Sequence, residues 1–316
     1  MASAAQVPQK LTTMPPRRMA QIMNESATNE ALVQDLLRLL DVEKRGEDQF
    51  LGSRKPGGVG RVFGGQVIAQ ALGAAERTVS EEREVHSLHA YFLRGGSEDH
   101  AIDYRIERDF DGGSFSNRRV IASQQGKPIL NLTASFHKSE GGVSHQDAMP
   151  DITPPADLPS QEDLIARFAD KLPESMQQFV MQKRPIEIRP VNWKHWLGVE
   201  KGPPVLATWF RTVAPLADDP LVHRSILAYA SDYTLLGTAT VPHGLGWMRG
   251  DVQGVSLDHA VWFHDKFRAD DWLLYYTESS WAGRARGFCR GKIFSRDGRL
   301  VAETAQEGLI RLKTGI

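Results

Sequence analysis

Two parts of the chain repeat the same local sequence at a spacing of about 170 residues. The segment Ser87-Leu-His-Ala-Tyr-Phe92 matches Ser256-Leu-Asp-His-Ala-Val-Trp-Phe263. In the same way, Gly126-Lys-Pro-Ile-Leu-Asn-Leu-Thr-Ala-Ser135 matches Gly298-Arg-Leu-Val-Ala-Glu-Thr-Ala-Gln306. Two matches at a common spacing, within the same order of expected elements, indicate an internal duplication. The chain is therefore expected to fold as two copies of one unit.

The first copy is predicted to begin with an enclosed helix. Residues Val62–Arg77 are mostly apolar and small on every face once the glycines are passed, which is typical of a buried helix. Apolar runs separated by glycine turn signals then predict four strands. These are expected at Val85–Leu93, Ala101–Arg108, Phe115–Ser123 and Pro128–His137. An amphipathic helix is predicted upstream, with Asn29 as its N-cap.

The second copy has the same order of elements. A buried helix is predicted at Ser225–Leu236, followed by four strands. These strands are expected at Val255–His264, Trp272–Ser280, Arg286–Ser295 and Leu300–Ile310. A helix followed by antiparallel strands indicates the α+β class, with one long helix packed on a face of each sheet. Two such units can join edge to edge into one continuous sheet, which covers the strand edges that each would expose alone.

Composition excludes several classes of protein. The 316 residues carry 38 Lys and Arg against 39 Asp and Glu, so a basic nucleic-acid binder is not indicated. The sequence contains no apolar run near the ~18 residues that a membrane span needs. The one cysteine, Cys289, excludes an intramolecular disulfide and a Cys-rich metal site, and it fits a reducing intracellular compartment. The histidines show no spacing typical of metal ligands, so we expect neither a metal nor a cofactor.

Asp232 is the most informative single residue. It lies in the second predicted helix among Leu227, Ala228, Leu235 and other apolar residues, where a carboxylate loses hydration that aliphatic neighbours cannot replace. It must therefore be paired, hydrogen-bonded or placed against a cavity. The alternative is a purely structural carboxylate, satisfied by a strand backbone or by Arg224. The matching helix of the first copy has no acid between Val62 and Ala75.

Common catalytic motifs are missing from the sequence. There is no Gly-x-Ser-x-Gly nucleophile elbow and no P-loop, and the glycines of Gly57–Gly65 do not follow a clear buried strand. Ser256 and Gln306 are polar residues in strands of the second copy, and residues of these types are most often structural. The residues alone therefore leave the chemistry open.

Several motifs, taken together, resemble the acyl-CoA thioesterase II family. They are Arg61–Leu72, His86–Arg94, Gly113–Val120, Gly126–Ile129, Tyr229–Asp232, Asp258–His264, Arg284–Gly291 and Gln306–Gly308. The likeness runs from about Glu30 to Arg311, nearly the whole ordered chain. It implies a double hotdog fold, in agreement with the duplication, and hydrolysis of fatty acyl-CoA to free fatty acid and coenzyme A.

The resemblance also implies three catalytic residues. The family's aspartate falls on Asp232, its hydroxyl residue on Ser256 and its glutamine on Gln306. The hydroxyl residue is threonine in some members, and serine keeps the same functional group. On this basis we expect Asp232 to accept a proton from the attacking water, which Ser256 and Gln306 would hold. Backbone N–H groups near a helix N-terminus are the expected oxyanion donors.

The resemblance completes the predicted organisation. We expect a disordered leader at residues 1–28, an N-terminal hotdog repeat at 29–140, a linker at 141–185 and a catalytic C-terminal repeat at 186–316. A homo-oligomer, dimer or higher, is expected from the family likeness. The location would be the peroxisomal matrix or the cytosol, although the chain does not end in Ser-Lys-Leu. Two other functions stay open: a catalytically silent acyl-CoA-binding module, and a hotdog enoyl-CoA hydratase, which would need an Asp–His pair.

Overall fold

The structure is a computed structural model that describes residues 28–55, 57–58, 60–160, 163–164, 167, 183–247 and 250–313. The leader predicted at residues 1–28 lies outside this part except for Thr28, and so does much of the linker predicted at residues 141–185. In the described part of the chain, no helix is long and apolar enough to cross a membrane.

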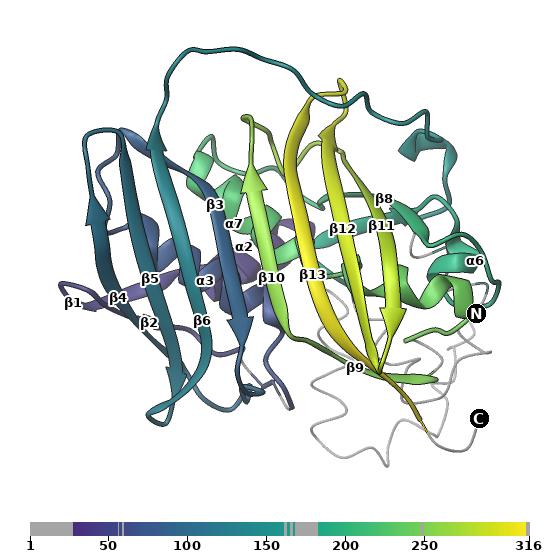
Figure 1. The fold of residues 1–316 in the computed structure, drawn as a ribbon, viewed down its shortest axis with the longest axis horizontal. Helices are drawn as coiled ribbons and strands as arrows, with labels where there is room; N and C mark the ends of the chain where they lie inside the picture. Colours follow the sequence, from purple (N-terminus) through teal and green to yellow (C-terminus); the bar gives the residue numbers. More distant parts are fainter. Residues whose placement is uncertain are drawn as a thin grey trace, which may run out of the picture.

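One antiparallel sheet of thirteen strands dominates the described residues (Figure 1). The strands of the first copy are β1 (Val42–Gly46), β2 (Gln49–Gly52), β3 (Arg83–Phe92), β4 (Ile102–Asp111), β5 (Phe115–Gln124) and β6 (Lys127–Lys138). Those of the second are β7 (Ile186–Pro190), β8 (Val205–Thr212), β9 (Val252–Ser256), β10 (Asp258–Phe263), β11 (Leu273–Gly283), β12 (Arg286–Ser295) and β13 (Leu300–Leu312).

The strand order shows the duplication directly. From one edge to the other it runs β1-β2-β4-β5-β6-β3-β10-β13-β12-β11-β8-β7, so the second copy repeats the first in reverse across the β3–β10 junction. At that junction His89 lies opposite Ala260 in an antiparallel pair. The predicted α+β fold, with two repeats joined into one continuous sheet, is confirmed. The edges that each repeat would expose alone are paired with each other, as expected.

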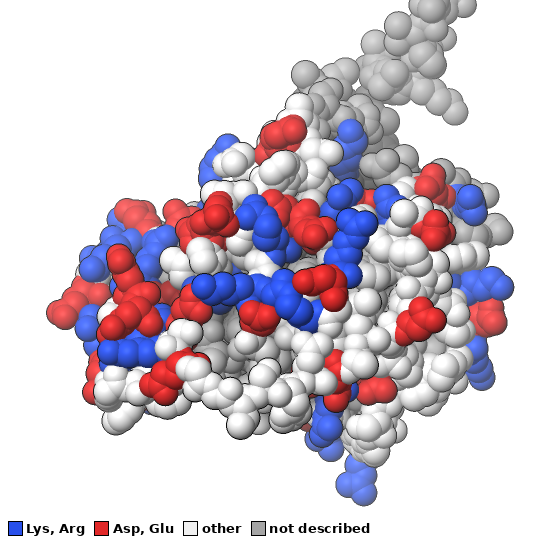
Figure 2. Space-filling view, turned by 90° about the horizontal axis from the view of Figure 1, so that it is seen from above, with Lys and Arg blue, Asp and Glu red and all other residues white. Residues whose placement is uncertain are grey.

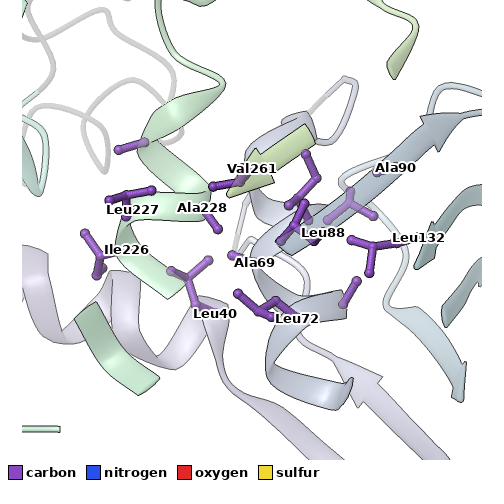
Figure 3. Close-up of a cluster of buried hydrophobic side chains, with 14 of the residues drawn as sticks. Leu40, Ala69, Leu72, Leu88, Ala90, Leu132, Ile226, Leu227, Ala228 and Val261 are labelled. Carbon is purple, nitrogen blue, oxygen red and sulfur yellow. The ribbon is translucent and has the colours of Figure 1, made fainter. Parts of the chain in front are cut away.

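The long helices lie on one face of the sheet. They are α2 (Asn29–Leu40), α3 (Gly64–Glu76) and α7 (Pro220–Ser231), and α3 packs against α7 behind β3 and β10 (Figure 1). Short helical segments complete the chain: η3 (Pro155–Asp157), α6 (Trp193–Trp196) and η5 (Leu235–His243). The core fills the space between helices and sheet (Figure 3), where Ala69, Leu72, Leu88, Ile226 and Leu227 are fully buried. The small residues of α3 allow this close packing, as predicted for an enclosed helix.

Helix boundaries differ from the predictions in two places. Thr28, not Asn29, is the N-cap of α2, because its hydroxyl accepts from the N–H of Ala31. The helix predicted at residues 225–236 begins earlier, at Pro220, and ends at Ser231. Asp219 caps its start, and Asp232 is its C-cap residue. The apolar run that continued the predicted helix belongs instead to the 3-10 helix η5.

The strands also differ from the predictions. The single strand expected at residues 255–264 is divided into β9 and β10 at Leu257, whose N–H bonds the carbonyl of Glu307 and whose carbonyl accepts from Phe92. The strands β1, β2, β7 and β8 were not predicted. They are short or lie before the helix of each copy, where no repeated motif marked them.

The segment after β6 runs across the second copy, on the face of the sheet opposite the long helices. It arches over one end of the sheet (Figure 1), and the Gln146 amide bonds the backbone of Gly298 and Leu300. Further along, Met149, Ile152 and Leu158 pack on a second apolar cluster built from Trp209, Trp272, Leu274 and Phe294. The repeat boundaries of 29–140, 141–185 and 186–316 stay a prediction.

Candidate functional site

Asp232 lies where two helices of different repeats meet. It is the residue that ends α7, and the backbone N–H of Gly65, in the first turn of α3, hydrogen-bonds its carboxylate. The free N–H groups at a helix start and the helix dipole both favour a negative charge. Asp232 belongs to the second repeat and is therefore stabilised as an anion by the helix start of the first repeat. This arrangement follows from the antiparallel packing of the two helices.

Ser256 and Gln306 both donate to the same oxygen of Asp232. The Ser256 hydroxyl lies 3.2 Å from Oδ1, and the Gln306 amide nitrogen lies 2.7 Å from it. Ser256 is the last residue of β9, and Gln306 lies in β13 with 0% of its surface exposed. The three residues predicted from the sequence are thus brought together, although Ser256 ends a strand and does not open one. The oxygen of the Gln306 side-chain amide, Oε1, is buried and has no hydrogen-bond partner among the described residues.

A bulge between β9 and β10 sets the position of Ser256. On β13, Gly308 pairs with Ser256 and Ala305 pairs with Ala260, so the register changes by one residue between them. The Asp258 carboxylate accepts from the N–H of Glu307 at 2.6 Å, which replaces a backbone partner at the break. Bulges re-aim side chains in this way. The strand therefore bends at the point where the Ser256 hydroxyl must reach Asp232.

Two glycines allow α3 to approach the carboxylate. A Cβ atom on Gly64 would lie 2.6 Å from Oδ2 of Asp232 and 2.9 Å from the Phe92 ring. A Cβ atom on Gly65 would lie 2.3 Å from the carbonyl oxygen of Tyr229. Neither position has room for a side chain. Gly64 and Gly65 therefore belong to the candidate site, although their sequence pattern was interpreted only as part of a predicted helix.

The pKa of the Asp232 carboxyl is raised toward neutral pH. Burial raises the pKa of Asp232 from 3.8 to about 6, against the opposing effect of hydrogen bonds from Gln306, Ser256 and Gly65. The residue as a whole is half-buried. A carboxylate with this pKa is ionised at pH 7 and still basic enough to accept a proton.

Known proteins with this sequence pattern are acyl-CoA thioesterases. The acyl-CoA thioesterase family matches residues 176–309, and the acyl-CoA thioesterase N-terminal domain matches residues 53–137. Human acyl-coenzyme A thioesterase 8 is 41% identical over 87% of this chain and 88% of its own length. Acyl-CoA thioesterase 2 of Haemophilus influenzae is 38% identical over 89% of this chain and 98% of its own. The chain belongs to the acyl-CoA thioesterase family.

A solved structure agrees with this membership. The acyl-CoA thioesterase II TesB2 of Mycobacterium marinum covers 90% of this chain and 98% of its own length, with a TM-score of 0.72 and 39% identity. The family resemblance and the hotdog fold predicted from the sequence are therefore confirmed.

Arg224, one of the two partners considered for a purely structural Asp232, is engaged elsewhere. Arg224 does not contact Asp232. Its Nε lies 3.0 Å from Oε1 of Glu76, the last residue of α3, in a buried ion pair. The statement that the first helix has no acid holds only up to Ala75, because the acid follows one residue later. Asp232 receives its hydrogen bonds from neutral donors, which leave its charge in place.

No histidine takes a place beside Asp232. His259 bonds the Ser231 hydroxyl at 2.8 Å, and burial lowers its pKa to about 3. Among the contacts of the described residues, none joins a histidine to Asp232. An Asp–His pair of the kind that a hydratase would use is therefore missing from the described part of the site. The described residues also contain no group of three or more His, Cys, Asp or Glu that could hold a metal ion.

An aromatic cluster lies next to the candidate site. Phe63 packs edge-on against Tyr229 with ring centroids 5.1 Å apart, and it lies 5.0 Å from the Tyr233 ring. The Tyr233 hydroxyl donates to that of Tyr229 at 3.1 Å. Tyr229 and Tyr233 flank Asp232 in sequence, and Phe63 is the N-cap residue of α3. The large cavity of the molecule, about 970 Å³, is not here, since its lining residues belong to the other end of α7.

Proposed function

We propose that the protein hydrolyses fatty acyl-CoA to free fatty acid and coenzyme A, with Asp232 as general base. Family membership supports the thioester-hydrolase class that the sequence predicts. The observation that carries the residue assignment is the double hydrogen bond to Oδ1. Two neutral donors fix the carboxylate without neutralising it.

The proposed first step is attack of water on the thioester carbonyl. Asp232 takes a proton from the water as its oxygen bonds the carbonyl carbon. The carbonyl oxygen becomes an oxyanion, and the N–H of Gly64 at the start of α3 is our candidate for its donor, because the N–H groups of Gly65 and Gln66 already bond Asp232 and Phe63. Since Ser256 and Gln306 both donate to Asp232, we assign them first to orienting the base. The unpartnered Oε1 of Gln306 adds an acceptor that can hold a hydrogen of the attacking water.

The second step expels the thiol. The carbon–sulfur bond breaks as the oxyanion returns its electron pair, and the proton held by Asp232 passes to the departing sulfur. A thiol of pKa about 8.5 is a good leaving group and needs little acid assistance. No covalent intermediate on Ser256 is required, because its hydroxyl contacts a carboxylate and no described histidine is placed to activate it.

A direct test is thiol release from palmitoyl-CoA by the wild type and by Asp232→Asn. We expect kcat to fall by about 10²–10⁴-fold, as for loss of a general base. Asp103→Asn is the matched control, since Asp103 is an exposed carboxylate on β4. Unchanged hydrolysis in Asp232→Asn would remove Asp232 from the mechanism. Binding without hydrolysis in the wild type would favour the silent binding module, and hydration of an enoyl-CoA would favour the hydratase.

Assembly and location belong to the same proposal. We propose a homo-oligomer, dimer or higher, in the peroxisomal matrix or cytosol. The single, buried Cys289 supports a reducing compartment. Analytical ultracentrifugation of the purified chain tests the first point, and imaging of the tagged protein in its own cells tests the second.

A further inference from the structure

The residue before Asp232 is tied to the sheet by a buried network of hydrogen bonds. Ser231 is the last residue of α7, and 0% of its surface is exposed. The last carbonyl groups of a helix have no partner within the helix and need one from elsewhere. The Tyr275 hydroxyl supplies it, at 3.0 Å from the carbonyl oxygen of Ser231. Since a carbonyl oxygen can only accept, the tyrosine is the donor.

Tyr275 is oriented in turn by a threonine two strands away. The Tyr275 hydroxyl lies 2.8 Å from that of Thr304. Because the one hydroxyl proton of Tyr275 goes to Ser231, Thr304 donates to the tyrosine oxygen. Thr304 lies in β13 two residues before Gln306, and side chains two residues apart point to the same face of a strand. The strand that supplies one donor to Asp232 therefore also supports the residue before it.

A glycine allows the Tyr275 ring to cross the strand between β11 and β13. Gly291 of β12 lies opposite Thr304 of β13. A Cβ atom on Gly291 would overlap the Tyr275 ring and lie 2.7 Å from the hydroxyl oxygen of Thr304. Glycine inside a strand often marks such a close approach. The three neighbouring strands are therefore shaped so that the tyrosine reaches both of its partners.

The side chain of Ser231 is held as well as its carbonyl. The Ser231 hydroxyl lies 3.0 Å from the carbonyl oxygen of Ala228 and 2.8 Å from Nε2 of His259. The carbonyl takes the one hydroxyl proton, so the neutral imidazole donates from Nε2. The other ring nitrogen, Nδ1, is buried without a partner among the described residues and is then the unprotonated one. Ser231 is thus fixed by β10 through its side chain and by β11 through its backbone.

From these contacts we propose that Tyr275, Thr304 and His259 are positioning residues for thioester hydrolysis. They fix Ser231, and with it the adjacent Asp232, where the two neutral donors reach the carboxylate. All three act through Ser231, and none is assigned a contact with the substrate. A small displacement of a catalytic group is costly in rate, so a buried support of this kind matters. The inference rests on the proposed function, because it applies only if Asp232 is the base.

The first test removes a single hydroxyl group. Tyr275→Phe frees the Ser231 carbonyl, and we expect kcat for palmitoyl-CoA to fall about tenfold at pH 7 while KM changes little. The rate falls at low pH as Asp232 takes up a proton, and this acidic limb of the pH–rate profile should move to higher pH. The reason is that the displaced carboxylate loses part of the hydrogen bonding that lowers its pKa.

Tyr104→Phe is the matched control. Tyr104 is 1% exposed, against 2% for Tyr275, and its hydroxyl donates to the side chain of Gln70 at 2.8 Å. Both variants therefore remove a buried hydroxyl and leave a buried acceptor without its donor. Tyr104→Phe should lower the melting temperature comparably, and it should leave kcat and the acidic limb unchanged.

The second test follows the hydrogen bond that Thr304 donates. Thr304→Val keeps the shape of the side chain and removes its hydroxyl, so kcat should fall, but less than in Tyr275→Phe. Thr304→Ser restores a hydroxyl and should retain the wild-type kcat and pH profile. Because Thr304 acts through the tyrosine, adding Thr304→Val to Tyr275→Phe should lower kcat by less than about twofold further. Losses that multiply in the double variant would overturn this order of donors.

A shift of the acidic limb can be assigned to Asp232. Burial lowers the pKa of His259 to about 3, and it raises the pKa of the other titratable groups around the network, namely Tyr229, Tyr233, Tyr275 and Cys289. The nearby charged residues Arg184 and Asp258 are the same in every variant. On the face seen from above in Figure 2, basic and acidic side chains are interspersed, so their fields largely cancel.

The outcomes separate this inference from the function on which it rests. If Asp232→Asn abolishes hydrolysis while Tyr275→Phe keeps the wild-type kcat and pH profile, the positioning role is overturned and the thioesterase stands. Equal losses of kcat in Tyr275→Phe and Tyr104→Phe would also overturn it, because the rate would then follow stability alone. Unchanged hydrolysis in Asp232→Asn would instead reject the proposed base.

Discussion

The Gln306 amide donates a 2.7 Å hydrogen bond to Oδ1 of Asp232, and this pair joins the central strand β13 to the end of α7. A neutral donor stabilises the carboxylate without cancelling its charge. An arginine at the same place would hold the pKa of the carboxyl low and make it a poor base. At the other end of the helix pair, Glu76 faces the cation of Arg224 instead of neutral donors.

The rate should follow the ionisation of Asp232. Because burial raises its pKa to about 6, we expect kcat/KM for palmitoyl-CoA to be constant above pH 7 and to fall about tenfold per pH unit below 6. Initial rates measured from pH 4.5 to 8.5 test this fall in kcat/KM on the acidic side of the profile. A profile flat down to pH 4.5 would contradict the assignment of the base.

Removing the Gln306 amide should move the acidic limb of the pH–rate profile to higher pH. The hydrogen bond from Gln306 is the strongest influence that lowers the pKa of Asp232, so Gln306→Leu should raise the pKa above 6. We expect a lower kcat at pH 7 with partial recovery at pH 8.5. Ser256→Ala should shift the limb in the same direction, whereas Ser256→Thr keeps the hydroxyl and should retain most activity. A rate loss without any change in the pH profile would indicate a role separate from Asp232.

The ionised carboxylate of Asp232 should lower the free energy of unfolding at neutral pH. An acid whose pKa is raised from 3.8 in the unfolded chain to about 6 in the fold favours folding below pH 3.8, and this contribution is lost as the pH rises through 6. The difference corresponds to roughly 3 kcal/mol at pH 7. Asp232→Asn should therefore increase the free energy of unfolding by about 1–3 kcal/mol at pH 7.5 and change it little at pH 4. Denaturant titrations at both pH values measure this, and a loss of stability at pH 7.5 would disagree.

Gly64→Ala should disable the site without unfolding the chain. The new Cβ would lie 2.6 Å from Oδ2 of Asp232, so either the carboxylate or the start of α3 must move. We expect at least a tenfold loss of kcat, since a small misplacement of a catalytic group is costly. Gly73→Ala is the control, because its Cβ would meet nothing within 4 Å in the same helix. That variant should keep its activity and gain roughly 0.5–1 kcal/mol of stability.

The ion pair at the other end of the helices should matter for stability. Arg224→Met leaves Glu76 buried without its cation, and we expect a loss of about 3–5 kcal/mol at pH 8. The loss should shrink as the pH falls toward 7, because removal of Arg224 raises the pKa of Glu76 further and the carboxyl of the variant then takes up a proton in the fold. The double variant Arg224→Met/Glu76→Gln should recover much of the stability at pH 8. Equal stability of the wild type and both variants at that pH would show that the pair is not coupled to folding.

The sequence by itself determined the duplication, the α+β class and the family, and through the family resemblance it predicted Asp232, Ser256 and Gln306 as site residues. Apolar periodicity and repeated motifs are local signals, so the strands at Arg286–Ser295 and Phe115–Ser123 could be predicted nearly residue by residue. A carboxylate among aliphatic residues is likewise visible without coordinates.

Only the tertiary structure decided how those residues meet. Asp232 is held by the helix start of the opposite repeat at Gly65, and the bulge at Leu257 aims Ser256 at it. Arg224 belongs to Glu76, a residue 148 positions away. These contacts depend on the antiparallel packing of α3 against α7 and on one change of strand register, and neither has a local sequence signal strong enough to reveal it.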